Sequence, residues 1–249
     1  MNSIAQQEPD TGGMPYEERQ RFNRVVAWLH SFRYRQIVAL FDRMAREAQG
    51  QQIKVVEIGC AHGTLFATLN ERFHIAYTGI ENDASLAEVA KRRYGHQPNF
   101  RMIQDSVQNA LDYLQNADVL VALETLEHIP EHEVVWITEA VAAAQPKLFV
   151  CSVPVEIGPA IWLKNVGSFV TGYMRHKEYR WSETWWAGLY QLDKLPPHGT
   201  GHKGFDWRWL AQTIRHNMKI TKISKLPFGF LPAALAFSVL IVAKPRNSV

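Results

Sequence analysis

This chain has few cysteines, a small net charge and no long apolar run, and each of these features argues against a class of protein. Only Cys60 and Cys151 are cysteines among 249 residues, which favours a reducing compartment over a disulfide-linked framework. The formal net charge of +3 is too small to indicate a nucleic-acid partner by itself. The longest apolar stretch, Leu231 to Ala243, is too short to span a bilayer and contains Pro232.

We expect no secretory signal at the N-terminus of the chain. Its first residues, Met1 to Gly13, are polar and lack the apolar core of a secretory signal. Hydrophobic residues make up 47% of the chain, which is enough for a folded core, and the length fits a single domain over 1–249. We therefore expect one cytoplasmic domain, with peripheral contact to a membrane left open.

Short apolar runs alternate with helical patterns of apolar residues between residues 53 and 152. The expected strands are Ile53–Ile58, Ala76–Ile80, Phe100–Ile103, Asp118–Leu123 and Lys147–Ser152. The expected helices are Thr64–Arg72, Ala84–Tyr94, Val107–Gln115 and Glu131–Ala144. This alternation predicts an α/β fold in which helices cover both faces of a parallel sheet.

Three further segments flank this half of the chain. Apolar residues at helical spacing predict an N-terminal helical cap over 15–49, with a helix from Tyr16 to Glu47 that breaks near Ser31. Segment 153–204 is rich in glycine, proline and aromatic residues, and we expect an irregular insertion or lid. The expected elements of 205–249 are the helix Asp206–His216 and an antiparallel strand pair, Ile220–Lys225 and Leu235–Ala243.

A glycine-containing turn, in the sequence VVEIGCAHGT, follows the first expected strand. The β-branched run ends in Glu57, and Gly59 and Gly63 follow before a helix begins. Such glycines allow a tight turn and the close approach of a ligand to the backbone. The dinucleotide fingerprint needs a glycine where Thr64 stands, which makes NAD a poor fit. The turn resembles motif I of class I S-adenosylmethionine-dependent methyltransferases, E/D-x-G-x-G-x-G, with Ala61 at the middle glycine.

This resemblance covers roughly Ile53 to Lys244 and carries expectations about the fold and the cofactor. It implies a Rossmann-like, mostly parallel sheet of seven strands with an antiparallel C-terminal pair and an N-terminal helical lid. It also implies that S-adenosylmethionine binds the half of the chain at 53–152.

Acidic residues lie at or just past four consecutive expected strand ends, at the sheet edge where ligands of open α/β sheets bind. Glu81 is placed to accept hydrogen bonds from two ribose hydroxyls, and Asp105 from an adenine amino group. In the alternative interpretation Glu81 is an ordinary turn acid and Asp105 is a helix N-cap. The candidate cofactor-binding residues are Glu57, Gly59, Ala61, Gly63, Glu81, Asn82, Asp105, Ser106 and Glu124.

A second motif, the sequence ETLEHIP at residues 124–130, follows the fourth expected strand. In a turn or helix, Glu124 lies one turn from Glu127 and His128, so these three residues are the candidate catalytic group. The segment resembles the E-x-L-E-H-x-P motif of many class I methyltransferases, including the ubiquinone-biosynthesis O-methyltransferases and the small-RNA 2′-O-methyltransferases, the latter with a further downstream histidine. The resemblance implies a divalent ion such as Mg²⁺ on these three residues and on His202 or His198. In the metal-free alternative, which stays open, His128 acts as a general base.

The acceptor pocket is expected in the least regular part of the chain. Glu156 and His202 lie in segments that resemble the acceptor-side motifs of relatives, so they are the candidate substrate-binding residues. Aromatic and basic side chains of 159–190 suit a packed lid or a contact with a membrane surface, whereas nucleic acid fits less well.

These observations predict an S-adenosylmethionine-dependent methyltransferase that acts on an oxygen atom. The expected acceptor is a small, quinone-like or lipid-like molecule, with assistance by a divalent metal left open. The alternatives are an RNA 2′-O-methyltransferase and a cofactor-binding regulator without turnover, although a pure binder does not need Glu124, Glu127 and His128.

Overall fold

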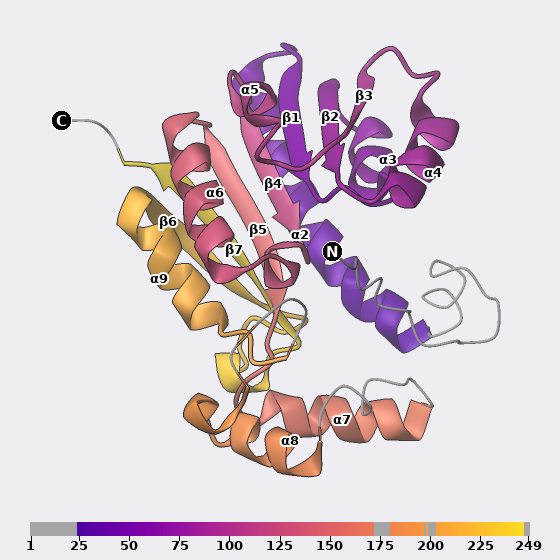
Figure 1. Ribbon diagram of the computed structural model, residues 1–249. Coiled ribbons are helices and arrows are strands. Elements are labelled where there is room, and N and C mark those ends of the chain that lie inside the picture. The colour runs from indigo at the N-terminus through magenta and orange to yellow at the C-terminus, as the bar shows by residue number, and fades with distance from the viewer. Residues whose placement is uncertain (1–23, 172–179, 197, 199–202, 247–249) are drawn as a thin grey trace, which may run out of the picture.

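The computed structural model describes residues 24–171, 180–196, 198 and 203–246 (Figure 1). Seven strands form one sheet in the order β3-β2-β1-β4-β5-β7-β6. The strands are β1 Ile53–Ile58, β2 Ile75–Glu81, β3 Phe100–Gln104, β4 Val119–Leu123, β5 Leu148–Pro154, β6 Met218–Leu226 and β7 Ser238–Pro245. The first five pair in parallel, and β7 runs antiparallel to both β5 and β6, so the predicted sheet is confirmed.

Helices cover both faces of this sheet. They are α2 Arg24–Ala48, α3 Thr64–Asn70, α4 Ala84–Tyr94, α5 Leu111–Leu114, α6 Glu131–Ala143, α7 Ala160–Thr171, α8 Trp181–Gly188 and α9 Trp207–Asn217. The alternation of side chains along β4 explains the two layers, because a strand sends successive residues to opposite faces. Val119 and Val121 pack in the core under α2, α3 and α4, whereas Leu120 and Ala122 pack in the core under α5, α6 and α9.

Helix α2 runs without interruption, so the predicted break near Ser31 is wrong. The Ser31 hydroxyl donates to the carbonyl of Trp28 at 2.7 Å, which places the serine inside the helix. The helix buries Ile37 and Phe41 against the sheet layer. It ends at Ala48, and Gly50 follows with a φ of +87°, as expected for a glycine that closes a helix.

The insertion after β5 is more regular than the sequence indicates. Helices α7 and α8 pack together below the sheet in Figure 1, so the expectation of irregular structure is wrong for both. The rings of Trp162 and Trp185 stack at 5.4 Å, and the indole of Trp162 donates to the carbonyl of Thr184 at 3.1 Å. Conversely, the helix expected at Val107–Gln115 is reduced to α5, because the residues before Leu111 form turns.

None of the helices in the described ranges has the length and apolar character needed to cross a bilayer.

Candidate active site

The turn after β1 has an unusual backbone that favours small residues. Gly59, Ala61 and Gly63 all have positive φ values, of 69°, 44° and 77°. A Cβ on Gly59 would lie 2.3 Å from the Thr125 side chain, so this position has no room for any other residue. Thr125 itself donates to the carbonyl of Ile58 at 3.2 Å and joins the turns after β1 and β4.

Glu81 at the end of β2 is tied directly to this turn. One carboxylate oxygen accepts from the backbone N–H of Ala61 at 2.9 Å, and the other accepts from that of Asp83 at 2.9 Å. The fold therefore brings Glu81 and the glycine turn together, as the motif predicts, while Asn82 beside it is exposed. Their contacts with a cofactor stay predictions.

Glu57 lies inside the protein, with only 4% of its surface exposed. The Tyr77 hydroxyl donates to its carboxyl group. Burial raises the pKa of Glu57 to about 8, although the Tyr77 hydrogen bond and the charge of Arg33 act in the opposite direction. Glu57 is therefore protonated at neutral pH in this state, which the sequence alone does not indicate.

Asp105 after β3 makes the contacts of a capping residue. One carboxylate oxygen accepts from the backbone N–H of Ser106 at 2.7 Å and from the side chain of Asn109 at 2.9 Å. These bonds agree with the interpretation of Asp105 as a capping residue. The residues directly after it form turns, however, and the helix α5 begins only at Leu111. A contact of Asp105 with adenine stays a prediction.

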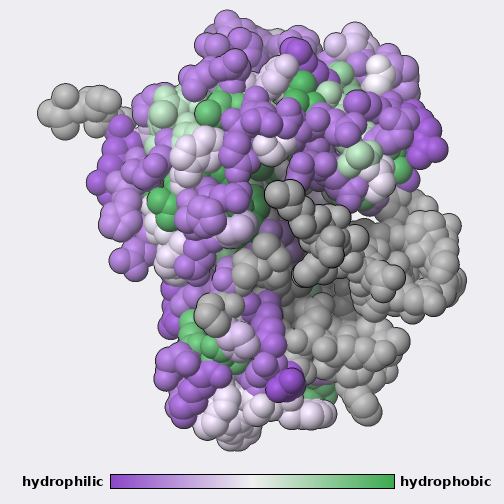
Figure 2. All heavy atoms as spheres, viewed as in Figure 1, coloured by the Kyte–Doolittle hydropathy of each residue, from purple (hydrophilic) through white to green (hydrophobic). Residues whose placement is uncertain are grey.

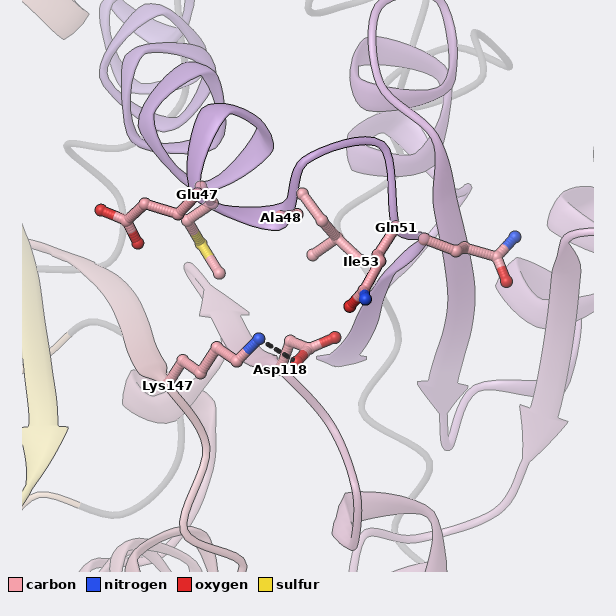
Figure 3. A pocket seen from close by; sticks show the side chains of 8 residues that line it. Glu47, Ala48, Gln51, Ile53, Asp118 and Lys147 are labelled. Atoms are coloured by element: carbon pink, nitrogen blue, oxygen red, sulfur yellow. Dashed lines mark ion pairs between the residues drawn. The ribbon is translucent and has the colours of Figure 1, made fainter.

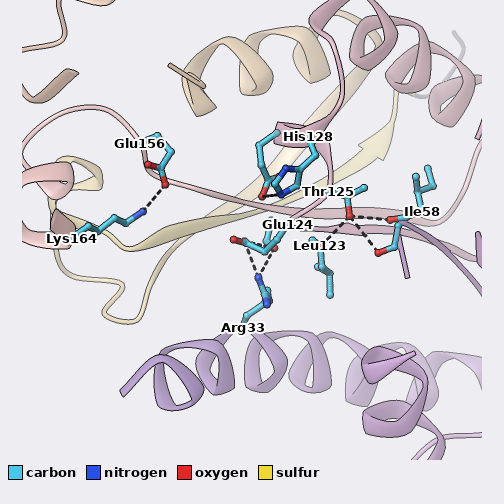
Figure 4. A network of polar contacts seen from close by, with 11 residues as sticks. Arg33, Ile58, Leu123, Glu124, Thr125, His128, Glu156 and Lys164 are labelled. Atoms are coloured by element: carbon cyan, nitrogen blue, oxygen red, sulfur yellow. Dashed lines mark hydrogen bonds and ion pairs between the residues drawn. The ribbon is translucent and has the colours of Figure 1, made fainter. Parts of the chain in front are cut away.

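Glu124 is held by a cation that the sequence analysis missed. Its φ is +50°, a conformation that non-glycine residues rarely adopt. Arg33 of α2 pairs with its carboxylate at 2.8 Å, and the Ser152 hydroxyl donates to it at 2.9 Å (Figure 4). Burial pulls the pKa of Arg33 down, but Glu124, Tyr34 and Glu127 raise it above its ordinary value. Arg33 therefore keeps its charge inside the site.

Glu127 and His128 follow on a short 3₁₀ turn, Leu126–His128. Glu127 is fully buried, and burial together with the charge of Glu124 raises its pKa well above the ordinary range. His128 has 51% of its side chain exposed, and its Nε2 lies 3.9 Å from a Glu127 oxygen. Burial lowers the pKa of His128, so its imidazole is neutral at neutral pH.

The predicted metal-ligand set does not assemble among the described residues. No three His, Cys, Asp or Glu side chains within these ranges converge on one point. The physical reason is local, because the backbone turn at Glu124 directs its carboxylate to Arg33 while Glu127 is buried. His202 lies outside the described residues. The alternative histidine, His198, is described: its Nδ1 lies 3.1 Å from the Lys203 carbonyl.

Glu156 is fully buried in an ion pair. Its carboxylate lies 3.1 Å from Nζ of Lys164, which also donates to the carbonyl of Val155 at 2.8 Å. The ammonium group lies 4.7 Å from the ring centre of Phe237. Glu156 thus anchors α7 to the end of β5, and its predicted contact with the substrate is untested.

A small polar pocket lies at the other edge of the sheet, where β1 and β4 begin (Figure 3). It has a volume of about 150 Å³. Lys147 and Asp118 form an ion pair of 2.9 Å at its wall. Its position at the amino ends of the strands separates it from the glycine turn and Glu124.

Comparisons with known proteins agree with this architecture. Residues 55–147 match the family model of a methyltransferase domain. The structure resembles the methyltransferase domain of a bacterial Hen1 protein, with 16% identity, 87% of this chain and 98% of that chain covered, and a TM-score of 0.60. It also resembles magnesium protoporphyrin IX methyltransferase from Synechocystis with bound SAH, with 13% identity, 93% and 94% coverage, and a TM-score of 0.55. No curated protein sequence matches the chain significantly.

The matched segment is a methyltransferase domain, and it contains the glycine turn and the Glu124–His128 segment. The match assigns this segment to a methyltransferase domain, and the seven-stranded sheet around it has the fold of the solved methyltransferase structures.

Arg33 offers a test of how the site is held together. We expect Arg33→Gln to lower the free energy of unfolding by about 3 kcal/mol, because Glu124 would keep a partly buried charge without its guanidinium partner. Urea denaturation measures the change, and Arg35→Gln on the exposed side of α2 is the control. Adding Glu124→Gln should recover part of the loss. Equal stability of the Arg33 and Arg35 variants would contradict the role given to the ion pair.

Proposed function

We propose that this protein transfers the methyl group of S-adenosylmethionine to an oxygen atom of a small, quinone-like or lipid-like acceptor. The observation that carries the proposal is His128, a half-exposed and neutral imidazole beside the buried Glu127 at the end of β4. A neutral imidazole at this edge suits the removal of a proton from a hydroxyl group.

The cofactor is expected along the ends of β1 and β2. The backbone of the glycine turn allows close approach, and Glu81 supplies carboxylate oxygens for ribose hydroxyls. Glu57 lies below this position as a buried acid that can ionise when a cationic ammonium group arrives.

The chain's own contribution is to align the acceptor, to exclude water and to take up one proton. S-adenosylmethionine, when bound, supplies an electrophilic methyl group and leaves as a neutral thioether. The acceptor oxygen forms the new bond to the methyl carbon as the bond from carbon to sulfur breaks, and the hydroxyl proton passes to the imidazole of His128. Glu124, paired with Arg33, lies near His128, and its negative charge favours the protonated product state of the imidazole.

A divalent ion fits this arrangement poorly. Arg33 and Ser152 already hold the carboxylate of Glu124, so a metal would have to displace a guanidinium group. We derive no catalytic step through a metal and expect turnover to persist in a chelator. A loss of turnover in chelator that Mg²⁺ restores would contradict this part of the proposal.

The test of function is a methyl-acceptor screen with purified protein. Phenols, quinols, lipid-like alcohols and RNA are offered with S-adenosylmethionine, with and without chelator, and the methylated product is identified. Methylation of an oxygen atom in a phenol, quinol or lipid supports the proposal. Methylation of RNA alone supports the 2′-O-methyltransferase alternative, and cofactor binding without any product supports the regulator.

Glu81 tests the placement of the cofactor. We expect Glu81→Gln to weaken S-adenosylmethionine binding roughly 10- to 100-fold, because a carboxylate that accepts from ribose hydroxyls is replaced by an amide that also donates. Titration calorimetry measures the affinity, and Glu71→Gln at the exposed end of α3 is the control. Binding of the variant at the affinity of the unaltered protein would show that Glu81 is only a turn residue.

A further inference from the structure

Large hydrophobic side chains are exposed almost entirely at one edge of the molecule. Ten of the eleven exposed large hydrophobic residues among the described ranges belong to α2, to the insertion after β5 or to the segment between β6 and β7. The exception is Val135 of α6. By contrast, hydrophilic residues predominate over α4, α5 and α6 in the view of Figure 2. Such a concentration on a soluble domain indicates an interaction surface.

The sheet topology places this surface next to the candidate active site. Leu226, the last residue of β6, pairs with Ser238, the first of β7, and Ser238 pairs with Pro154 at the carboxyl end of β5. The segment 227–237 therefore leaves the sheet at the same edge as Glu124 and His128. Its Phe237 carbonyl accepts from the backbone N–H of Val155 at 3.1 Å.

An aromatic cluster joins this segment to α2. Between ring centres, Phe228 lies 6.0 Å from both Trp28 and Phe32. The ring of Phe230 stacks on that of Phe228 at 5.7 Å. Phe230 is 83% exposed, Trp28 44% and Phe228 40%. Phe32 directly precedes Arg33 in α2, so this ring of the cluster lies within a helical turn of the residue that pairs with Glu124. We call Trp28, Phe32, Phe228 and Phe230 the aromatic tip.

Within the described parts of the two segments that carry the aromatic tip, the flanking charges are all positive. Residues 24–41 and 218–249 contain no aspartate or glutamate. Arg35 lies over the ring of Phe32 at 5.4 Å, and Lys222 of β6 reaches Gln36 of α2 at 3.1 Å. Exposed aromatic rings flanked by cations, without acids, complement the interface of a membrane that contains anionic lipids.

We propose that this edge of the protein docks on an anionic phospholipid bilayer through the aromatic tip, so that the active site faces acceptors held in the membrane. The inference rests on the proposed function and narrows its acceptor to lipid-like molecules. Exposed aliphatic residues on the insertion, Leu163 and Val166, extend the same apolar edge and favour lipid over stacked nucleobases. The bilayer is reached without a membrane-spanning helix in the described ranges.

Flotation with vesicles tests the proposal on the full chain. We expect binding to vesicles of phosphatidylcholine mixed with phosphatidylglycerol, and weaker binding to phosphatidylcholine alone. The double variant Phe228→Ser/Phe230→Ser should lose roughly tenfold or more in partitioning, since two rings leave the interface. Val135→Ser on α6 is the matched control and should bind as the unaltered protein does.

Several results would overturn the docking surface. One is the absence of binding to anionic vesicles, and another is binding of the double variant as strong as that of the unaltered protein. The others are a dimer, seen by light scattering, that the double variant loses, and a preference of the protein for RNA over vesicles. The double variant should keep its affinity for S-adenosylmethionine, because neither phenylalanine belongs to the candidate cofactor site. Vesicle binding without turnover on any acceptor would overturn the proposed function alone, and turnover without vesicle binding would overturn the docking alone.

Discussion

His128→Gln is expected to reduce kcat about 10²- to 10⁴-fold while the affinity for S-adenosylmethionine stays unchanged. Glutamine keeps a polar side chain of similar reach but cannot take up the hydroxyl proton in the transition state. Because burial lowers the pKa of His128, the neutral base should already be present at neutral pH. The acid limb of the kcat/KM profile should therefore lie below the ordinary histidine pKa of about 6.5.

The chain offers a matched control for this result. His132 lies four residues downstream in α6 with 83% of its side chain exposed, and His132→Gln should leave turnover unchanged. Calorimetric titration separates binding from turnover, and the rate is followed over pH for the unaltered protein. Full turnover of the His128 variant, or an acid limb well above neutral pH, would show that another group accepts the proton.

Glu57→Gln is expected to gain stability relative to the unaltered protein as pH rises and to lose the proton release that accompanies cofactor binding. The pKa of Glu57 is about 8 in the folded protein, well above that of an exposed glutamate. Between these two values the folded state holds a proton that the unfolded state has lost, so the free energy of unfolding falls as pH rises. A glutamine does not titrate. The variant should therefore become progressively more stable than the unaltered protein as pH rises toward about 8, by a few kcal/mol at most.

Cofactor binding gives the second readout of Glu57. If the ammonium group of the cofactor ionises Glu57, binding at neutral pH should release a proton, up to one per site, in the unaltered protein and none in the variant. Calorimetry in buffers with different ionisation enthalpies counts the protons. Tyr77→Phe is the companion variant, because loss of the phenol donor should raise the pKa of Glu57 further. If the free energy of unfolding of Glu57→Gln fell over the same pH range in parallel with that of the unaltered protein, the raised pKa of Glu57 would be contradicted.

The sheet and the glycine turn are predictable from sequence for a simple reason. Strands that are buried on both faces, such as β4 with its five buried residues, read as unbroken apolar runs. The turn after β1 is equally visible, because a positive φ at two nearby positions, Gly59 and Gly63, favours glycine. Local chemistry dictates both features.

Arg33 and the insertion depend on distant contacts, and local patterns miss them. Arg33 occupies a position of the apolar stripe of α2, four residues before the buried Ile37, and that is the only signal of its burial. Its partner Glu124 is remote in the chain. Helices α7 and α8 gain their stability from each other, through Trp162 and Trp185, and short aromatic segments carry little helical signal alone.

The close approach of Gly59 to Thr125 has a consequence for how this protein can change over evolutionary time. A methyl group at position 59 would occupy the space of the threonine side chain. An alanine or serine at 59 therefore meets two obstacles, the Thr125 side chain and a backbone φ of +69° that side chains rarely adopt. The two positions constrain each other's replacement, although one follows β1 and the other β4.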